Sequence, residues 1–345
     1  MASNKIFIQA AEQISIQQPL SEEWMESPVY YEDGFVKAVN PPFRDYLAAG
    51  ETRRMGNLMK RALVTTLKVL RETGTEHPDA VITGTSIGSL DYTERFLDAM
   101  TENGEEALSP TYFMQSTHNT VGATLGIYTK NHGYNTTYSH GAMSFDLAVF
   151  DAWMQMTLGD VTTALVGGHD EMVESYFELL KKTGYVGVEN MAPCGEVAMS
   201  TLLTLDGGVD HLCELAGITI CHDYSFDRLK LLVEQMLERA GLSLKDVDAV
   251  LTGVNGNPCH DTSYYQLMDA VFPGLPLLRY KHLFGENYTS SALGFYAMAH
   301  CIGKGCLPTH LEDDARPGRC TAMRNVIIAN QMKGKECSFI LLRKS

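Results

Sequence analysis

The amino-acid sequence predicts an α/β fold that is made of two similar halves. Two short segments, 79-DAVITG-84 and 248-DAVLTG-253, are nearly identical, and each reads as a β-branched strand that ends in Thr-Gly. A long amphipathic helix precedes each of them, and another strand precedes each helix. Because strands that alternate with helices form layered sheets, we predict a duplicated β-α-β unit, with halves at residues 1–207 and 208–345. A chance match between two common strands is the alternative.

The predicted elements come in the same order in both halves. In the first half, a strand at 5–10 is followed by a helix at 55–74, in which apolar residues recur on one stripe. In the second half, a strand at 213–220 is followed by a helix at 226–241 with the same pattern. Both helices end at a glycine, which readily adopts the left-handed conformation that closes a helix. The agreement in order and spacing favours true duplication.

The stretch 135-NTTYSHGAMSFDLAVFDAW-153 reads as a buried strand, a tight turn and the start of an amphipathic helix. A helix N-terminus offers unpaired N–H groups and the positive end of the helix dipole, so many enzymes place a nucleophile in such a turn. Here the turn carries Ala142 and contains no cysteine. The stretch therefore has the local structure of a nucleophile site without an obvious nucleophile.

Composition narrows the classes of function. The chain has 345 residues, of which 45% are hydrophobic, so it can bury a sizeable core. A formal net charge of −15 argues against binding to nucleic acid or to anionic membrane surfaces. Apolar stretches are too short to span a membrane and no apolar run with a basic start opens the chain, so we expect a cytoplasmic protein. The eight cysteines are scattered without zinc-ligand spacing, so we expect reduced thiols and no metal.

Four further segments follow one another along the chain in an order and spacing typical of one family. They are 109-SPTYFMQSTHNTVGA-123, 158-LGDVTTALVGGHDEM-172, 195-GEVAMSTLLTL-205 and 281-KHLFGENYTSSALGFYAMA-299. Together they resemble the β-ketoacyl-acyl carrier protein synthases, which implies a thiolase-like fold of two halves in five α-β-α-β-α layers. The resemblance also implies a Claisen condensation, in which an elbow cysteine takes an acyl chain and two histidines support decarboxylation. Substrate would arrive on the phosphopantetheine arm of acyl carrier protein, and we expect no other cofactor.

The resemblance allows the family's functional positions to be placed on this sequence. Counted without a gap, the family's cysteine falls on Ala142, which has no nucleophilic atom. The second histidine falls on Glu286, where a carboxylate would repel an enolate. We expect Glu286 to pair instead with Lys281, the lysine that the family's motif retains here, although Glu286 could also act as a general base. The glycine-rich gate loop of the family is missing, and 325-NVIIANQMKGKECSF-339 stands in its place.

The first histidine of the family should lie in the loop 254-VNGNPCHDTSYY-265. We interpret the degenerate histidine position as Gly256 or Asn257, because His260 comes too late in the loop. Neighbours in sequence rarely adopt the geometry of a catalytic triad, so we interpret Cys259-His260-Asp261 as a loop with a helix cap at Asp261. The family's fold is therefore expected without its condensing chemistry.

Two other arrangements could supply a reactive group. His140 could act as a base, with Ser139 or Ser144 as the nucleophile. Adjacent residues on a strand point to opposite faces, which disfavours Ser139, and Ser144 reads as the cap of the following helix. His140 is more simply a histidine that fills the turn. Cys194 has no histidine near it in sequence and reads as a small buried apolar residue.

The segment that begins at Ser109 has a second implied role. In the family this segment lies at the dimer interface, and one aromatic position, here Tyr112, reaches toward the partner's acyl tunnel. Ordinary interface packing would favour aromatic residues equally. The residues that we assign to the tunnel or the interface are Tyr112, Phe113, Met114, Thr117, His118 and Asn119.

The absence of the cysteine, both histidines and the gate loop resembles the pattern of a chain length factor, in particular from aryl-polyene or flexirubin-type pathways. Such a chain would be catalytically inactive, would pair with a catalytic ketosynthase as a heterodimer, and would shape its acyl tunnel. Acyl carrier protein is acidic, so it would dock on the partner and not on this negatively charged chain. The alternatives are a malonyl-acyl carrier protein decarboxylase or other acyltransferase of the same fold, and a homodimeric acyl-binding scaffold.

Overall fold

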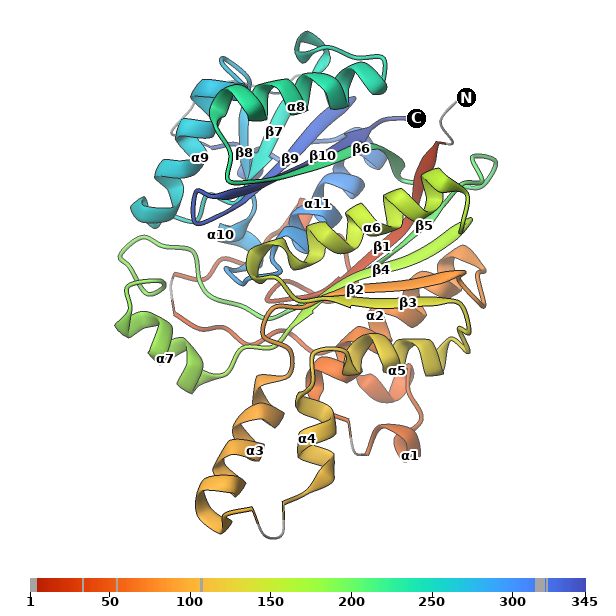
Figure 1. The fold of residues 1–345 in the computed structure, drawn as a ribbon, viewed down its shortest axis with the longest axis vertical. Coiled ribbons are helices and arrows are strands. Elements are labelled where there is room, and N and C mark those ends of the chain that lie inside the picture. Colours follow the sequence, from red (N-terminus) through yellow and green to blue (C-terminus); the bar gives the residue numbers. More distant parts are fainter. Residues whose placement is uncertain (1–4, 33, 54, 106–107, 314–319, 321) are drawn as a thin grey trace.

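The computed structural model describes residues 5–345 apart from residues 33, 54, 106–107, 314–319 and 321. Figure 1 shows two β-sheet regions stacked between layers of helices. The strands of the first half are β1 (Ile6–Ile14), β2 (Ala80–Gly84), β3 (Tyr134–Tyr138), β4 (Thr163–Asp170) and β5 (Val197–Thr204). The strands of the second half are β6 (Cys213–His222), β7 (Ala249–Thr252), β8 (Leu277–Arg279), β9 (Asn325–Met332) and β10 (Glu336–Arg343).

The strand order confirms the duplication. The hydrogen-bonded order is β3-β2-β4-β5-β1 in the first half and β6-β10-β9-β7-β8 in the second. Read from the outer edge inward, β8, β7, β9, β10 and β6 repeat the positions of β3, β2, β4, β5 and β1. The repeated segments therefore form equivalent strands, β2 between β3 and β4, and β7 between β8 and β9, all parallel. A short antiparallel pairing of β1 with β6 joins the halves into one ten-stranded sheet.

The helices form three layers around these strands. Two outer layers cover the sheet from below and above in Figure 1, with α2 and α5 on the first half and α8 and α9 on the second, while α6 and α11 lie between the halves. This is the expected five-layer α-β-α-β-α arrangement. The helices are α1 (Ala49–Thr52), α2 (Asn57–Thr73), α3 (Leu90–Asn103), α4 (Pro110–Ser116), α5 (Thr120–Tyr128), α6 (Ser144–Leu158), α7 (Glu174–Lys182), α8 (Phe226–Arg239), α9 (Pro258–Val271), α10 (Lys281–Phe284) and α11 (Ser291–Lys304).

The two long helices predicted from periodicity are confirmed. They form α2 and α8, and the glycines that follow them, Gly74 and Gly241, have φ angles of +66° and +71°. Positive φ costs glycine little because it has no Cβ, so both helices stop where the sequence predicted.

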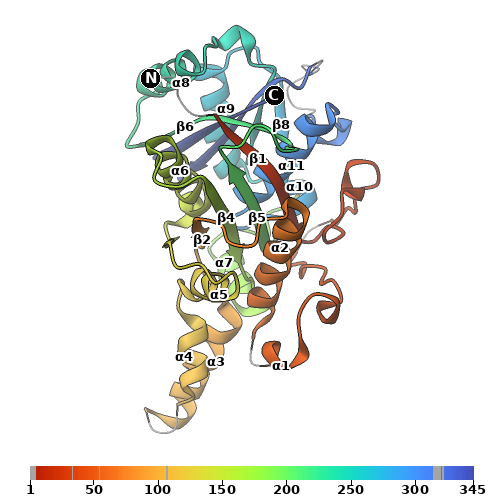
Figure 2. The same cartoon turned by 90° about the vertical axis from the view of Figure 1, so that its right-hand side faces the viewer.

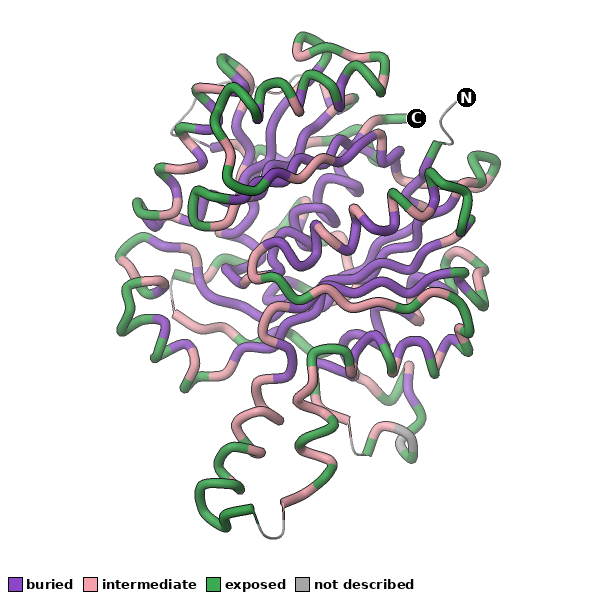
Figure 3. The backbone as a smooth tube through the Cα atoms, in the orientation of Figure 1, coloured by how far each residue is buried: buried purple, intermediate pink, exposed green. Residues whose placement is uncertain are grey.

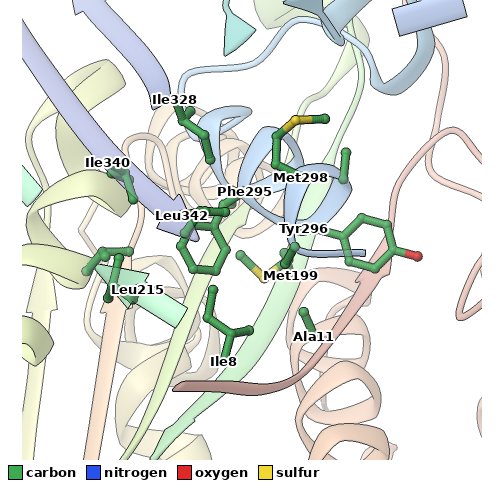
Figure 4. Close-up of a cluster of buried hydrophobic side chains, with 14 of the residues drawn as sticks. Ile8, Ala11, Met199, Leu215, Phe295, Tyr296, Met298, Ile328, Ile340 and Leu342 are labelled. Carbon is green, nitrogen blue, oxygen red and sulfur yellow. The ribbon is translucent and has the colours of Figure 1, made fainter. Parts of the chain in front are cut away.

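The main core lies between the halves, around α11. Every residue from Ser291 to Ile302 is buried, and a helix buried on all sides belongs inside a large domain. Figure 4 shows Phe295, Tyr296 and Met298 of this helix among side chains from strands of both halves. The purple backbone in Figure 3 shows the same central burial.

One part of the chain leaves this compact body. Helices α3 and α4 form a hairpin that projects away from the layers in both views (Figures 1 and 2), and neither helix contains a fully buried residue. Beside it, β3 is one of the two edge strands of the sheet, and within the described residues it pairs with β2 alone. The expectation of a buried strand at this position is wrong, because an edge strand has a neighbour on one side only, and no residue of β3 is fully buried.

No helix in the described part of the chain is both long enough and apolar enough to cross a membrane.

Candidate functional site

A cavity of about 440 Å³ lies beside the turn that precedes α6. Five separate segments meet there: the 3₁₀ turn Gly141–Met143, the end of α7 with the loop after it, the loop after β7 with the start of α9, the α10 region, and the end of β9 with its turn to β10. The side chains of Ala142, Asn255, His260, Lys281 and Glu286 all line this cavity. Positions that the sequence analysis took from three distant motifs are thus brought together by the fold.

Ala142 provides only a methyl group at the elbow. Its carbonyl oxygen accepts a hydrogen bond from Asn330 Nδ2 at 2.8 Å, which ties the turn to β9. Ser144 at the start of α6 is fully buried, donates its hydroxyl to Gly141 O at 2.8 Å and accepts the His140 N–H at 2.8 Å. The helix N-terminus is therefore built as an enzyme would build it, but neither side chain offers a free nucleophile to the cavity.

His140 does not complete an alternative catalytic pair. Its Nε2 lies 2.8 Å from Glu336 Oε2, and His222 Nδ1 lies 3.0 Å from the other oxygen of the same carboxylate. The Ser144 hydroxyl proton is already donated to a carbonyl, so the imidazole of His140 has no proton to take from it. Neither His140 nor Ser144 lines the cavity.

The expected pair of Lys281 and Glu286 is confirmed. Lys281 Nζ lies 3.0 and 2.8 Å from the two oxygens of the Glu286 carboxylate, and both side chains are buried. Asn255 Nδ2 also donates to Glu286 Oε2, at 2.5 Å. A buried charge is costly unless it is paired and hydrogen-bonded, so each of the two ions stabilises the other. Glu286 is held as an anchored carboxylate and not as a free general base.

Neither Gly256 nor Asn257, the two positions that we interpreted as the degenerate histidine position, lines the cavity. Gly256 has a φ angle of +90°, and a side chain there would meet the backbone of Asn190. Asn257 caps α9 by accepting the Cys259 N–H at 3.0 Å, and its amide donates to carbonyls of the loop after α7. The turn at Gly256 therefore directs both positions away from the cavity, and neither lines it.

From the end of β7 into α9, the residues that line the cavity are Gly253, Asn255, Cys259, His260, Ser263 and Tyr264. Gly253 directly follows β7, and a Cβ there would contact Tyr264 Oη and lie 3.0 Å from Lys281 Cε. A side chain at this position would therefore require the ends of the Tyr264 and Lys281 side chains to move.

His260 enters the cavity from the first turn of α9. The Asn255 Oδ1 accepts the Asn257 N–H at 2.9 Å, which places the Asn255 amide nitrogen toward Glu286 and, at 3.2 Å, toward His260 Nδ1. Nδ1 is therefore the acceptor, and the neutral ring carries its proton on Nε2. Burial lowers the pKa of His260, which favours this neutral form.

His260 was predicted to lie too late in a loop to reach the site. The dipeptide Asn257-Pro258, an N-cap followed by proline at the first helical position, could have predicted that a helix begins there. That dipeptide makes His260 part of a helix. The expected cap at Asp261 is wrong for the same reason: its carboxylate instead accepts the N–H groups of Asn255 and Gly256, at 2.9 and 2.8 Å.

Two thiols lie near the cavity in different settings. Cys194 is buried against Glu286, and burial, with the nearby carboxylate, raises the pKa of its thiol far above the ordinary value. This is the setting of an inert structural cysteine. Cys259, in contrast, is exposed and lines the cavity.

The residues assigned to a tunnel or an interface lie elsewhere. Tyr112, Phe113 and Met114 are on α4, on the projecting hairpin, and Thr117, His118 and Asn119 connect it to α5. None of them lines the cavity. The ring of Tyr112 packs on Tyr92 at 6.0 Å, while Phe113 and Met114 are 57% and 58% exposed. The fold therefore separates the predicted residues into an internal site and a surface.

Comparison with known proteins gives the class of this chain. Residues 22–215 match the family model of the β-ketoacyl synthase N-terminal domain, which is more than half of the chain. The chain belongs to the β-ketoacyl synthase family. A curated relative, 3-oxoacyl-(acyl-carrier-protein) synthase 2 of Mycobacterium leprae (strain TN), is 27% identical over 159 residues, which are 42% of this chain and 38% of the relative. The match thus spans well under half of that relative's length.

Two solved structures have the same fold. The ishigamide ketosynthase/chain length factor superposes with a TM-score of 0.83 at 17% identity and covers 100% of both chains. The complex of the ketosynthase ApeO with its chain length factor ApeC, from Xenorhabdus doucetiae, gives a TM-score of 0.78 at 15% identity and covers 99% of this chain and 98% of that chain. The expected thiolase-like fold is confirmed.

Proposed function

We propose that this chain is a non-catalytic subunit, similar to a chain length factor, that pairs with a catalytic ketosynthase and shapes its acyl tunnel. The observation that carries the proposal is the cavity at the elbow. It keeps the helix N-terminus and the lysine of a condensing enzyme, but Ala142 offers no nucleophile, and the side chains of Tyr264 and Lys281 occupy the space beside Gly253. Glu286 and Lys281 neutralise each other where an enolate would need support.

A surface for a partner supports the same proposal. The exposed apolar side chains on α3, α4 and α5 form what we name the hairpin patch: Leu97, Met100, Phe113, Met114 and Ile127. Exposed apolar side chains on neighbouring helices are typical of a protein–protein interface. The adjacent β3 is an edge strand, and edge strands readily pair with another chain. Tyr112 and Met114 on α4 and Thr117 at its end would then face the partner and limit the depth of its tunnel.

The net charge of this chain supports docking of acyl carrier protein on the ketosynthase subunit instead of on this one. A net charge of −15 disfavours docking of an acidic acyl carrier protein on this chain. Carrier protein and its phosphopantetheine-bound substrate would dock on the ketosynthase, in the extension of a polyketide or polyene chain. Within this proposal the complex is cytoplasmic.

The test is co-expression of the chain with ketosynthases that retain the cysteine and both histidines, followed by size-exclusion chromatography. We expect one ketosynthase to co-elute with this chain as a heterodimer. The double variant Phe113→Asp/Met114→Asp should lose co-elution, because two buried charges at an apolar interface are costly. Leu231→Asp is the matched control, since Leu231 is 52% exposed on α8, on the other half of the molecule.

Two outcomes would contradict the proposal and favour a rival. A homodimer that excludes every ketosynthase tested would favour an acyl-binding scaffold. Release of carbon dioxide from malonyl-acyl carrier protein by the isolated chain would favour a decarboxylase or another acyltransferase. The exposed thiol of Cys259 is the observation that keeps this second rival open, so Cys259→Ser is the variant that separates a catalytic thiol from a contaminating activity.

A further inference from the structure

A second cavity, of about 370 Å³, lies beside the part of β1 that no longer pairs with β6. Within the described residues, β1 pairs with β6 over residues 6–8 alone, and the cavity begins at the next residues of β1. The end of α2, the loop before β6, and His300 of α11 form other parts of its wall. The cavity shares no lining residue with the one beside Ala142, so it is a separate candidate site.

Carboxyl groups dominate the polar lining of this second cavity. They belong to Glu12, Glu22, Glu72 and Asp210. Among the described residues no lysine or arginine lines it. Ala10, Ala11 and Leu212 add an apolar surface, on which a methylene chain packs well. The lining therefore suits a cation that has an aliphatic part.

Two of the four carboxyl groups already have cationic or hydrogen-bonding partners. Glu22 is bonded to Lys304 and, at 2.6 Å, to His300 Nδ1, and Glu72 is bonded to Lys68. Asp210 is exposed, and it forms no ion pair within the described part of the chain. A bound cation gains most from the carboxyl groups that are not yet paired, which leaves Asp210 and Glu12.

Glu12 is buried in the wall of the cavity without a hydrogen-bond donor. Its residue is 8% exposed, and no N–H group of a described residue donates to its carboxyl group. The nearest cation, Lys68 Nζ, lies 3.8 Å away, which is beyond hydrogen-bond distance. Burial, together with the Glu72 carboxylate, raises the pKa of Glu12 to about 8, so this group holds a proton at neutral pH. A cation that entered the cavity would take the place of that proton.

We propose that this cavity binds a short aliphatic diamine. One ammonium group donates to Glu12 and displaces its proton, the other meets Asp210, and the methylene chain packs on the apolar wall. A metal ion fits less well, since no three metal-ligating side chains among the described residues are arranged to hold one. This site goes beyond the proposed function and does not depend on it.

The test is titration calorimetry of the full chain with putrescine, with butylamine and magnesium chloride as comparison ligands. We expect putrescine to bind about fivefold more tightly than butylamine, because its second ammonium group has a carboxylate to meet. Glu12→Gln keeps the shape of the protonated carboxyl group and should weaken putrescine binding about tenfold. Asp210→Asn should weaken putrescine binding about fivefold and leave butylamine binding unchanged.

The displaced proton gives a readout that a purely structural role of Glu12 would not produce. The apparent affinity for putrescine should rise about fivefold from pH 7 to pH 8, because less proton has to be displaced while the amino groups remain charged. The other titratable or charged groups around Glu12 are Lys68, Glu72, Glu22, Asp210, Tyr296, His300 and Lys304. Glu12→Gln removes only the titration of Glu12, so the rise should disappear in this variant.

Controls separate this inference from the proposed function. Glu234→Gln removes an exposed carboxylate of α8 outside the cavity and should leave the affinity unchanged. Glu12→Gln should still co-elute with a ketosynthase, and Asp210→Asn, at an exposed position, keeps the test open if Glu12→Gln does not fold. Absence of putrescine binding by the unaltered chain, unchanged binding by both variants, or displacement of putrescine by an equal concentration of magnesium would overturn the inference.

Discussion

The two repeated strands end in the same local structure and lead to different surfaces. Both β2 and β7 carry the sequence Asp-Ala-Val-x-Thr-Gly, and after each the loop amides turn toward a buried aspartate that comes directly after a histidine. In the first half, Asp170 accepts N–H groups from three consecutive loop residues, Ser86 to Gly88, at 2.9 to 3.0 Å. In the second half, Asp261 accepts two, from Asn255 and Gly256.

The two loops differ in the direction that the chain takes after them. After β2 the chain runs outward into the α3–α4 hairpin, and His169 beside Asp170 is fully buried with no hydrogen-bond partner among the described residues. After β7 the chain turns inward into α9, and His260 beside Asp261 lines the cavity. The same backbone arrangement thus leads to an outward hairpin in one half and to a residue that lines the cavity in the other.

The largest expected effect on stability comes from the glycines at the ends of the two repeated strands, Gly84 and Gly253. A Cβ at Gly84 would lie 2.5 Å from Ser144 C and O, which belong to the backbone of α6 and cannot rotate away. A Cβ at Gly253 would meet the movable end of the Tyr264 side chain. We expect Gly84→Ala to lower the free energy of unfolding by about 3 kcal/mol and Gly253→Ala by about 1 kcal/mol, measured by urea denaturation.

The double variant Gly253→Ala/Tyr264→Phe serves as the control for that comparison. Removing the hydroxyl removes the atom that the new methyl group would meet, so part of the lost stability should return. Equal losses for the two single glycine variants would break the comparison.

The next effect compares the two aspartates. Besides the three loop N–H groups, Asp170 accepts the hydroxyls of Thr85 at 2.6 Å and Thr289 at 2.9 Å, while Asp261 is bonded to two N–H groups. An asparagine presents an NH₂ group to some of these donors and leaves them unpaired. We expect Asp170→Asn to cost about 2 kcal/mol and Asp261→Asn about 1 kcal/mol, again by urea denaturation. A larger loss for Asp261→Asn would reverse the ranking of the two loops.

The smallest expected effect is on the pH dependence of stability, to which His169 and His260 contribute. Burial lowers the pKa of His169 from 6.5 to about 3. The unfolded chain therefore binds a proton below pH 6.5 that the folded chain does not, so stability falls as the pH falls. Between pH 8 and pH 5.5 this group should remove about 1.4 kcal/mol, and His169→Phe should abolish that part of the loss.

His260 sharpens the same experiment. Its pKa is also lowered by burial, but the Glu286 carboxylate acts in the opposite direction and the ring is only partly buried. The acid-dependent loss should therefore change less in His260→Phe than in His169→Phe. An equal pH dependence in the His169→Phe variant and the unaltered chain would show that this buried histidine does not titrate between the two states.

Much of the architecture was predictable because it depends on local patterns. The stripes of α2 and α8, their glycine ends and the paired Asp-Ala-Val strands all follow from side-chain periodicity and turn chemistry. The Lys281–Glu286 pair was predictable as well, since one short turn separates the two residues. The edge position of β3 was not, because the order of strands in a sheet depends on contacts between distant segments.

The sequence alone determined which atoms are present: no thiol at position 142, and a glutamate at 286 within reach of a lysine. Only the tertiary structure decided which side chains share the cavity. Three neighbouring loop residues, Asn255 to Asn257, could each have faced it, and the positive φ angle at Gly256 together with contacts to residues near position 190 selected Asn255. Residue type is a property of the chain, whereas the direction of a loop side chain is set by backbone torsions that distant contacts stabilise.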